Sequence, residues 1–261
     1  MARRPLIVSS ANVRLKAVRR LARGGAREFC LAEGERSVRA ALAAGAAVQE
    51  LYVAPDLLAG RDADLVAVAE TGGAAVVELG LDAFASLTKR RPDGLLAVVR
   101  RPRTALETLE LPQDPFVVVA VAIERPGNLG AIARTACAAG ADALLVADPC
   151  TDLFHRDAIR GSVGVIFSLS CATASSARAL AWLREREIRV VATTPAAREP
   201  YWSPSYSGAV AVALGSERHG LPLVWLEAAA ERVSVPVRGP VDSLNVGVAA
   251  GVVLCEAARS R

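Results

Sequence analysis

The sequence predicts an α/β protein in which parallel strands are covered by helices. Apolar residues make up 52% of the 261 residues but aromatic residues only 4%, which suits buried strands rich in Val, Leu and Ala. β-Branched runs alternate with segments of helical periodicity along most of the chain. Residues 116–123, FVVVAVAI, are typical of a strand covered on both faces. The length suffices for one large domain or two modest ones.

The first hundred residues predict a compact αβ module. Asn12 can cap a helix that ends near the glycine pair at 24–25. The elements expected after it are strand 28–32, helix 35–44, strand 48–53, helix 62–70, strand 75–79, helix 81–87 and strand 95–99. Residues 101–115 hold three prolines and few apolar residues. We therefore expect a domain at 1–103, a linker at 104–115 and a second domain at 116–261.

The sequence of the second domain predicts a longer alternation of strands and helices than that of the first. Its expected elements are strand 116–123, helix 129–139, strand 143–146, helix 155–160, extended segment 166–170, helix 176–187, strand 188–193, loop 195–207, strand 209–214, helix 223–230 and strand 233–235. A last helical pattern follows Asp242 and Ser243, either of which can cap it. Such an alternation predicts a parallel sheet layered by helices.

Composition excludes several classes of protein. The five cysteines are scattered and form no C-x-x-C pair, which argues against a metal site and a disulfide framework and favours a reducing compartment. The first residues, MARRPLIVSS, lack the apolar core of a signal peptide, and no later stretch is long and uncharged enough to span a bilayer. We expect a cytoplasmic protein without a metal.

The charge is distributed unevenly. Residues 1–103 carry 17 Lys and Arg against 11 Asp and Glu, whereas the remainder carries 14 against 16. A basic front end suits contact with a polyanion such as RNA, although an Arg-rich solvated face is the alternative. The candidate RNA-binding residues of this part are Arg14, Lys16, Arg19, Arg20, Lys89, Arg90 and Arg91. Three aromatic residues, Tyr201, Trp202 and Tyr206, could stack on a base or simply pack against the domain.

Common catalytic motifs are absent. The sequence has no G-x-G-x-x-G after a strand, no Walker lysine motif, no H-E-x-x-H and no G-x-S-x-G. Its two histidines, His155 and His219, lie in different stretches, so a metal centre or a histidine-based triad is disfavoured. We interpret both as surface or supporting residues.

Three stretches each follow a predicted strand and open a helix. They are ERPGNLGAIARTA at 124–136, LGSERHGL at 214–221 and VSVPVRGPVDSLNVGVAAG at 233–251. Such turns gather along one edge of a parallel sheet, where ligands bind. The polar side chains that can converge there are Asn128, Arg134, Glu217, Ser243 and Asn245. Because Arg134 lies on a mostly apolar helix, we expect it to be buried beside a phosphate or a carboxylate.

Within these stretches NLGAIARTA, LGSERHGL and VPVRGPVDSLNVGVAAG resemble, in order and spacing, the three motifs of the SpoU (TrmH) family of RNA ribose 2′-O-methyltransferases, within the SPOUT superfamily. The resemblance covers residues 123–251, and the N-terminal module is similar to the L30e-like substrate-binding domain that many ribosomal-RNA members carry. It implies a C-terminal trefoil knot that forms an S-adenosylmethionine site. It also implies a homodimer whose active site draws on both subunits.

The resemblance assigns roles to individual residues. The catalytic set is Asn128, Arg134, Glu217, Ser243 and Asn245. The cofactor set is Leu214, Gly215, Glu217, Gly220, Val235, Pro236, Val237, Ser243, Leu244 and Val246. Arg134 is also expected to bind RNA. We interpret it as a group that holds a phosphate rather than as the general base, since a guanidinium stays protonated at neutral pH.

Bland alternatives exist for each residue taken singly. Ser243 can be a helix cap, Asn245 can brace a loop, and Glu217 can pair with Arg218 or Arg134. The sequence also departs from the family pattern, with Val237 where Met is usual, Gly247 where Ser is usual and bulkier residues at 218–219. The expected activity is methyl transfer to a ribose of 23S ribosomal RNA. The alternatives are methylation of transfer RNA, or RNA binding without catalysis.

Overall fold

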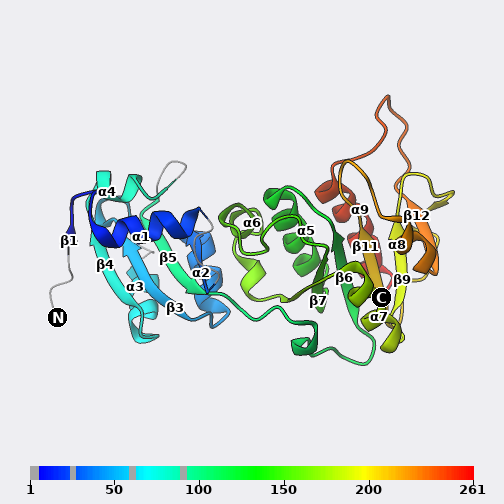
Figure 1. The fold of residues 1–261 in the computed structure, drawn as a ribbon, viewed down its shortest axis with the longest axis horizontal. Coiled ribbons are helices and arrows are strands. Elements are labelled where there is room, and N and C mark those ends of the chain that lie inside the picture. The colour runs from blue at the N-terminus through cyan, green and yellow to red at the C-terminus, as the bar shows by residue number, and fades with distance from the viewer. Residues whose placement is uncertain (1–5, 24–27, 59–62, 89–92) are drawn as a thin grey trace. The chain divides into compact units, whose positions relative to one another are not determined.

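The computed structural model describes residues 6–23, 28–58, 63–88 and 93–261, and the chain forms two compact units (Figure 1). Unit 1 comprises Met1–Pro102 and Phe154–Ser168, and unit 2 comprises Arg103–Leu153 and Leu169–Arg261. The expected domain at 116–261 differs from this division in two segments, because residues 103–115 belong to unit 2 and residues 154–168 pack with the N-terminal residues. No helix within the described ranges is long and apolar enough to cross a membrane.

Unit 1 is built on a five-stranded mixed sheet in the order β1-β4-β3-β5-β2. Its strands are β1 (Leu6–Ile7), β2 (Phe29–Glu33), β3 (Val48–Val53), β4 (Ala75–Leu79) and β5 (Leu95–Arg100). Its helices are α1 (Val13–Ala22), α2 (Glu35–Ala43), α3 (Ala63–Thr71) and α4 (Leu81–Ala85), with the 3-10 turn η1 (Pro55–Leu57). β5 runs antiparallel to both β3 and β2. Asn12 caps α1 as predicted, since its side chain accepts from the amide of Arg14 at 2.8 Å.

Residues 154–168 belong to unit 1 through close packing. Helix α6 (Arg156–Gly161) packs on β2, and the 3-10 turn η4 (Val165–Phe167) packs on α2. At Gly164, where φ is +85°, an added Cβ would lie 2.8 Å from Ser37 Cα, so only glycine permits this approach. The prediction of an extended segment at 166–170 was wrong, because Ile166 and Phe167 are buried in a turn and the next strand begins at Ser170.

Unit 2 contains a seven-stranded sheet in the order β10-β12-β9-β11-β6-β7-β8, and every pairing in it is parallel, as predicted. Its strands are β6 (Phe116–Val121), β7 (Ala143–Ala147), β8 (Ser170–Ala174), β9 (Arg189–Thr193), β10 (Glu199–Pro200), β11 (Val210–Leu214) and β12 (Glu231–Ser234). Its helices are α5 (Pro126–Ala138), α7 (Ser176–Glu185), α8 (Leu223–Ala228) and α9 (Val246–Arg259), with the 3-10 turn η3 (Leu106–Thr108).

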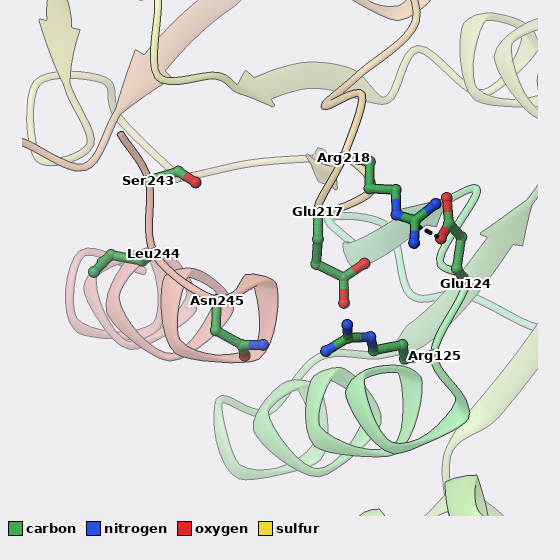
Figure 2. Close-up of a pocket in the computed structure, with 7 residues that line it drawn as sticks. All are labelled: Glu124, Arg125, Glu217, Arg218, Ser243, Leu244 and Asn245. Atoms are coloured by element: carbon green, nitrogen blue, oxygen red, sulfur yellow. Dashed lines mark ion pairs between the residues drawn. The ribbon is translucent and has the colours of Figure 1, made fainter. Parts of the chain in front are cut away.

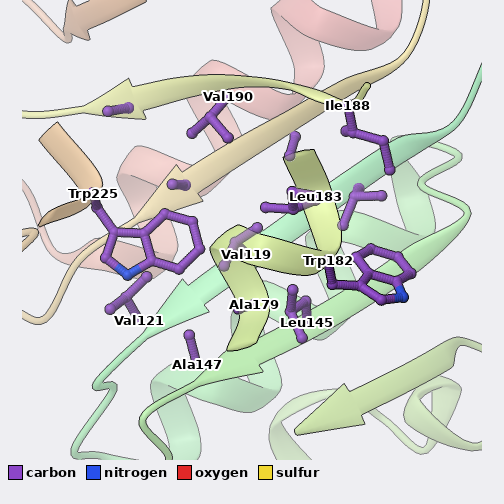
Figure 3. Packing of buried hydrophobic residues seen from close by; sticks show 14 of the residues in the cluster. Val119, Val121, Leu145, Ala147, Ala179, Trp182, Leu183, Ile188, Val190 and Trp225 are labelled. Atoms are coloured by element: carbon purple, nitrogen blue, oxygen red, sulfur yellow. The ribbon is translucent and has the colours of Figure 1, made fainter. Parts of the chain in front are cut away.

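Helices cover both faces of this sheet. Trp182 of α7 and Trp225 of α8 pack with Val119 and Val121 of β6 in one apolar cluster (Figure 3). α5 and α9 pack against each other and against β6 and β11 on the other face. All six residues of β6 are buried, which explains the unbroken apolar run in the sequence.

Two of the helices begin at residues that differ from the predicted ones. α5 begins at Pro126, a residue favoured at the first helical position, rather than at 129. α9 is capped by Asn245, whose side chain accepts from the amide of Gly247 at 3.0 Å. The prediction that Asp242 or Ser243 caps this helix was wrong, because the chain stays non-helical through Leu244 and the first helical residue is Val246.

Candidate active site

Three segments of unit 2 meet beyond the carboxyl ends of β6, β11 and β12. They line two neighbouring cavities, one of about 490 Å³ and one of about 220 Å³. Four residues line both cavities and form their shared wall: Glu217, Arg218, Ser243 and Leu244. The site can therefore place two ligands side by side, which is the geometry that group transfer requires.

The larger cavity has the size of a small-molecule site and a mostly apolar lining. The expected cofactor residues that line it are Leu214, Gly215, Glu217, Gly220, Val235, Val237, Ser243, Leu244 and Val246. Pro236 is exposed and is not part of this lining. Residues 193–196 also contribute, although no motif marks them. Only the sheet order, which places β9 beside β11, brings them to the cavity.

A tight backbone loop forms one wall of the larger cavity. Ser216 and Gly220 exchange two backbone hydrogen bonds of 3.2 and 3.0 Å, and Gly220 has φ +63°. A Cβ on Gly215 would lie 2.2 Å from the carbonyl carbon of Gly220. The first glycine of the loop is therefore required by close backbone approach.

The smaller cavity is polar and carries both signs of charge. Besides the shared wall, it is lined by Glu124, Arg125 and Asn245 (Figure 2). The Nε atom of Arg218 lies 3.6 Å from a carboxylate oxygen of Glu124. Sequence reasoning missed Glu124 and Arg125, and the one available signal was their position directly before Pro126 and α5.

Side chains from the three segments form a hydrogen-bonded chain at this cavity. The amide of Asn245 donates to the side-chain oxygen of Asn128 at 3.3 Å, and the amide of Asn128 donates to the carboxylate of Glu217. Because Asn245 also caps α9, its bracing role and its place in the site coexist. The structure thus brings together Asn128, Glu217 and Asn245, which lie far apart in the sequence.

Arg134 does not join them. It lies on the exposed face of α5, lines neither cavity and has no ion pair or hydrogen-bond partner within the described part of the chain. The expectation that it is buried was wrong, because Leu129, Ile132 and Ala133 occupy the buried face of α5 and position 134 falls opposite to them.

The departure at Gly247 has a packing explanation. A Cβ there would lie 3.0 Å from Cβ of Ala131 on α5, a contact tighter than ordinary packing. Glycine therefore allows α5 and α9 to lie close together, and their N-termini both reach the smaller cavity.

The basic residues expected to meet RNA are only partly free within unit 1. Arg14 Nε lies 3.1 Å from Glu50, and Arg19 donates to the backbone oxygens of Leu15 and Ser10. Lys16 and Arg20 are exposed. Lys89, Arg90 and Arg91 lie outside the described residues.

Of the three aromatic candidates in unit 2, Tyr206 is a packing residue. It is fully buried and donates to the backbone oxygen of Tyr201 at 2.6 Å. Trp202 is 54% exposed and packs edge-on against Tyr201. Only these two remain available for stacking.

The two histidines lie in different surroundings. His155 caps α6, and its Nδ1 accepts from the amide of Asp157 at 3.1 Å. His219 lines the larger cavity. Within residues 6–23, 28–58, 63–88 and 93–261, no group of three or more His, Cys, Asp or Glu residues could hold a metal ion.

The wholly parallel sheet, with paired cavities beyond its carboxyl edge, defines an α/β enzyme that brings a small-molecule donor to a polar acceptor. The chain belongs to the SpoU rRNA Methylase family, whose model matches residues 115–255. It is therefore an S-adenosylmethionine-dependent RNA methyltransferase, as the resemblance implied.

Known proteins match both units. The chain is 29% identical over 225 residues, 86% of each chain, to the 23S rRNA (guanosine(2553)-2′-O)-methyltransferase RlmP of Bacillus subtilis (strain 168). An RNA 2′-O ribose methyltransferase structure matches with TM-score 0.87 and 39% identity, covering 98% of this chain and 99% of the other. The AdoMet-bound rRNA methyltransferase from Sinorhizobium meliloti matches with TM-score 0.88 and 28% identity, covering 97% of each chain.

Proposed function

We propose that this protein transfers a methyl group from S-adenosylmethionine to a ribose 2′-hydroxyl of 23S ribosomal RNA. The observation that carries the proposal is the pair of cavities separated only by a wall of shared residues, which include Glu217 and Ser243. One cavity suits a nucleoside-sized donor, and the other presents the polar groups that a ribose and its phosphates need.

The larger cavity fits the cofactor by its shape and its chemistry. Its volume of about 490 Å³ lies within the usual range for small ligands, and apolar residues such as Leu214 and Val246 suit an adenine ring. At Gly215 there is no room for a Cβ, and this close packing brings the backbone of the loop 215–221 to the cavity wall. S-adenosylmethionine bound there supplies an electrophilic methyl group on a sulfonium.

The chain's own residues orient the acceptor. Asn128 donates to the Glu217 carboxylate and is itself held by Asn245 before RNA arrives, so the ribose meets a preorganised set of acceptors and donors. Positioning of this kind can lower the activation free energy by up to about 7–11 kcal/mol. Arg134 then clamps a phosphate and stabilises the developing alkoxide, while the proton leaves to phosphate or water.

This role for Arg134 requires a second subunit, because within one chain the residue lies outside both cavities. Arg134 is exposed on α5, and α9, which packs on α5, exposes apolar surface that includes Val248, 54% exposed, and Cys255. A second copy of the chain would cover this surface and form a two-fold homodimer. Each active site would then combine Asn128 and Asn245 of one subunit with Arg134 of the other.

Subunit mixing tests the shared site. Arg134→Ala and Asn245→Ala are each expected to retain under about 1% of activity, because each removes one half of every site. After the two variants are unfolded, mixed and refolded together, half of the dimers are mixed and each has one intact site, so roughly a quarter of wild-type activity should return. Methyl incorporation measures this. No recovery, or a monomer by light scattering, would contradict the shared site.

Labelled S-adenosylmethionine tests the substrate. We expect the label to enter unmodified large-subunit ribosomal RNA at a ribose 2′-oxygen, and not total transfer RNA, because the RlmP match spans 86% of each chain and so includes unit 1. Unit 1 would act as an L30e-like RNA-binding domain through Lys16, Arg20 and the basic residues Lys89, Arg90 and Arg91. Label in transfer RNA would overturn the substrate, and failure to bind S-adenosylmethionine would favour an assembly protein without catalysis.

Two further features belong to the proposal. A C-terminal trefoil knot is supported by the way the loop 215–221 and residues from the segment 235–244 line one cavity. A cytoplasmic location is supported by the ribosomal substrate of the named relative. An experimental structure of the complex with S-adenosylmethionine tests the first, and cell fractionation tests the second.

A further inference from the structure

The smaller cavity holds two arginines that the mechanism above does not use. Arg125 precedes α5 and Arg218 lies in the loop after β11, yet both side chains reach the same space (Figure 2). No family motif drew attention to Arg125, and Arg218 stands where smaller residues are common. Two cations that converge from separate segments on a polar cavity call for an anionic ligand.

The counter-ion of Arg218 is held loosely. The distance to Glu124 is 3.6 Å, and the side chains of Arg218 and Glu124 are 73% and 39% exposed. An exposed pair with such geometry contributes little stability, so an incoming anion can displace the carboxylate at small cost. A phosphate is a good replacement because it matches the planar fork of a guanidinium.

The backbone around the cavity favours the same ligand. Arg125 is the N-cap residue of α5, which has 13 residues, and Asn245 is that of α9, which has 14. Both helices therefore direct the positive ends of their dipoles toward the cavity. The second carboxylate in the lining, Glu217, already accepts the amide of Asn128, so part of its hydrogen-bonding capacity is taken.

We propose that Arg125 and Arg218 bind the backbone phosphates on either side of the target ribose, and that Arg218 exchanges Glu124 for a phosphate when RNA binds. This inference rests on the proposed function, since it takes the smaller cavity to be the ribose site. The two arginines would position the RNA so that the target ribose lies beside the methyl donor.

Substitution to glutamine tests each arginine. Arg218→Gln and Arg125→Gln should each raise KM for ribosomal RNA about 10-fold while kcat stays within about 2-fold. Each should also lower by about 1 the slope of log Kd for RNA against log salt concentration, because one phosphate contact is lost. Unchanged KM and salt slope would overturn the proposal. So would an effect on S-adenosylmethionine affinity alone, measured by calorimetry.

Arg178→Gln is the matched control. Arg178 lies in unit 2, forms an exposed ion pair with Glu107 and lines neither cavity, so its loss should change neither KM nor the salt slope. An equal effect of Arg178→Gln would mean that only overall charge matters, which overturns the proposal.

Glu124→Gln tests whether Arg218 binds phosphate or serves only as the ion-pair partner of Glu124. If Arg218 is freed for phosphate, RNA should bind about 2- to 5-fold more tightly. If Arg218 serves only to hold Glu124, both substitutions should weaken activity alike, which contradicts the proposal. RNA binding can be measured by fluorescence anisotropy without turnover. Loss of RNA methylation in the wild-type protein would refute the proposed function. The role of the arginines would still be tested, because RNA binding is measured separately.

Discussion

Gly215→Ala is expected to weaken S-adenosylmethionine binding at least about 30-fold, which corresponds to roughly 2 kcal/mol. The added Cβ would lie 2.2 Å from the carbonyl carbon of Gly220 and 2.3 Å from the amide nitrogen of Leu221. Both are backbone atoms of the loop that closes on itself at Ser216 and Gly220, so no side-chain rotation relieves the clash. The loop must open, and the cavity wall opens with it. Calorimetric titration with S-adenosylmethionine measures the loss.

Gly239→Ala provides the control for this substitution. Gly239 lies between Val237 and Ser243, which line the cavity, but an added Cβ there meets nothing within 4 Å. It should leave the affinity within about 2-fold of wild type. If Gly215→Ala bound S-adenosylmethionine as tightly as Gly239→Ala, the loop would not be part of the cofactor site.

Arg156→Ala should lower the free energy of unfolding of unit 1 by about 3–5 kcal/mol, because it leaves a carboxylate unpaired in a nearly buried position. Arg156 is 7% exposed, pairs with Glu33 of β2 and donates to the backbone oxygen of Leu87 at 3.4 Å. The side chain of Glu33 is only 12% exposed. We expect the transition of unit 1 in differential scanning calorimetry to fall by about 12–20 °C.

Two variants check the cause. Arg100→Gln breaks an exposed pair with Glu28 in the same unit and should cost under about 1 kcal/mol. The double substitution Arg156→Met with Glu33→Leu replaces both charges by apolar groups and should recover much of the loss. If Arg156→Ala melted like Arg100→Gln, residues 154–168 would not stabilise unit 1.

The convergence of the site was predictable where a motif marked each member. Asn128, Glu217 and Asn245 each follow a strand that ends at the same edge of the sheet, so a parallel topology alone brings them close together. Arg134 shows the limit of that argument. Its type and spacing matched the family pattern, but the face of α5 on which it lies is set by the packing of Leu129 and Ile132. Arg134 lines neither cavity, so its proposed role requires a partner subunit.

Residues without a motif escaped prediction for a related reason. Thr193 and Ala196 reach the larger cavity because β9 lies between β11 and β12, an order that periodicity does not encode. Arg125 reaches the smaller cavity because α5 begins at Pro126 rather than three residues later. The order of the strands decides the first case, and the residue at which a helix begins decides the second.

The sequence by itself determined the alternation of strands and helices, the parallel sheet of unit 2 and the three glycine-bearing turns. These follow from local hydrophobic periodicity and from backbone conformations that only some residues adopt. Only the tertiary structure decided that Asn245 caps α9, that Arg134 stays exposed and that residues 154–168 pack with unit 1. The physical reason is that packing decides them: the buried face of α5 leaves Arg134 exposed, Asn245 contacts Asn128 of α5 as well as the amide of Gly247, and residues 154–168 pack through Arg156 with Glu33 and Gly164 with Ser37.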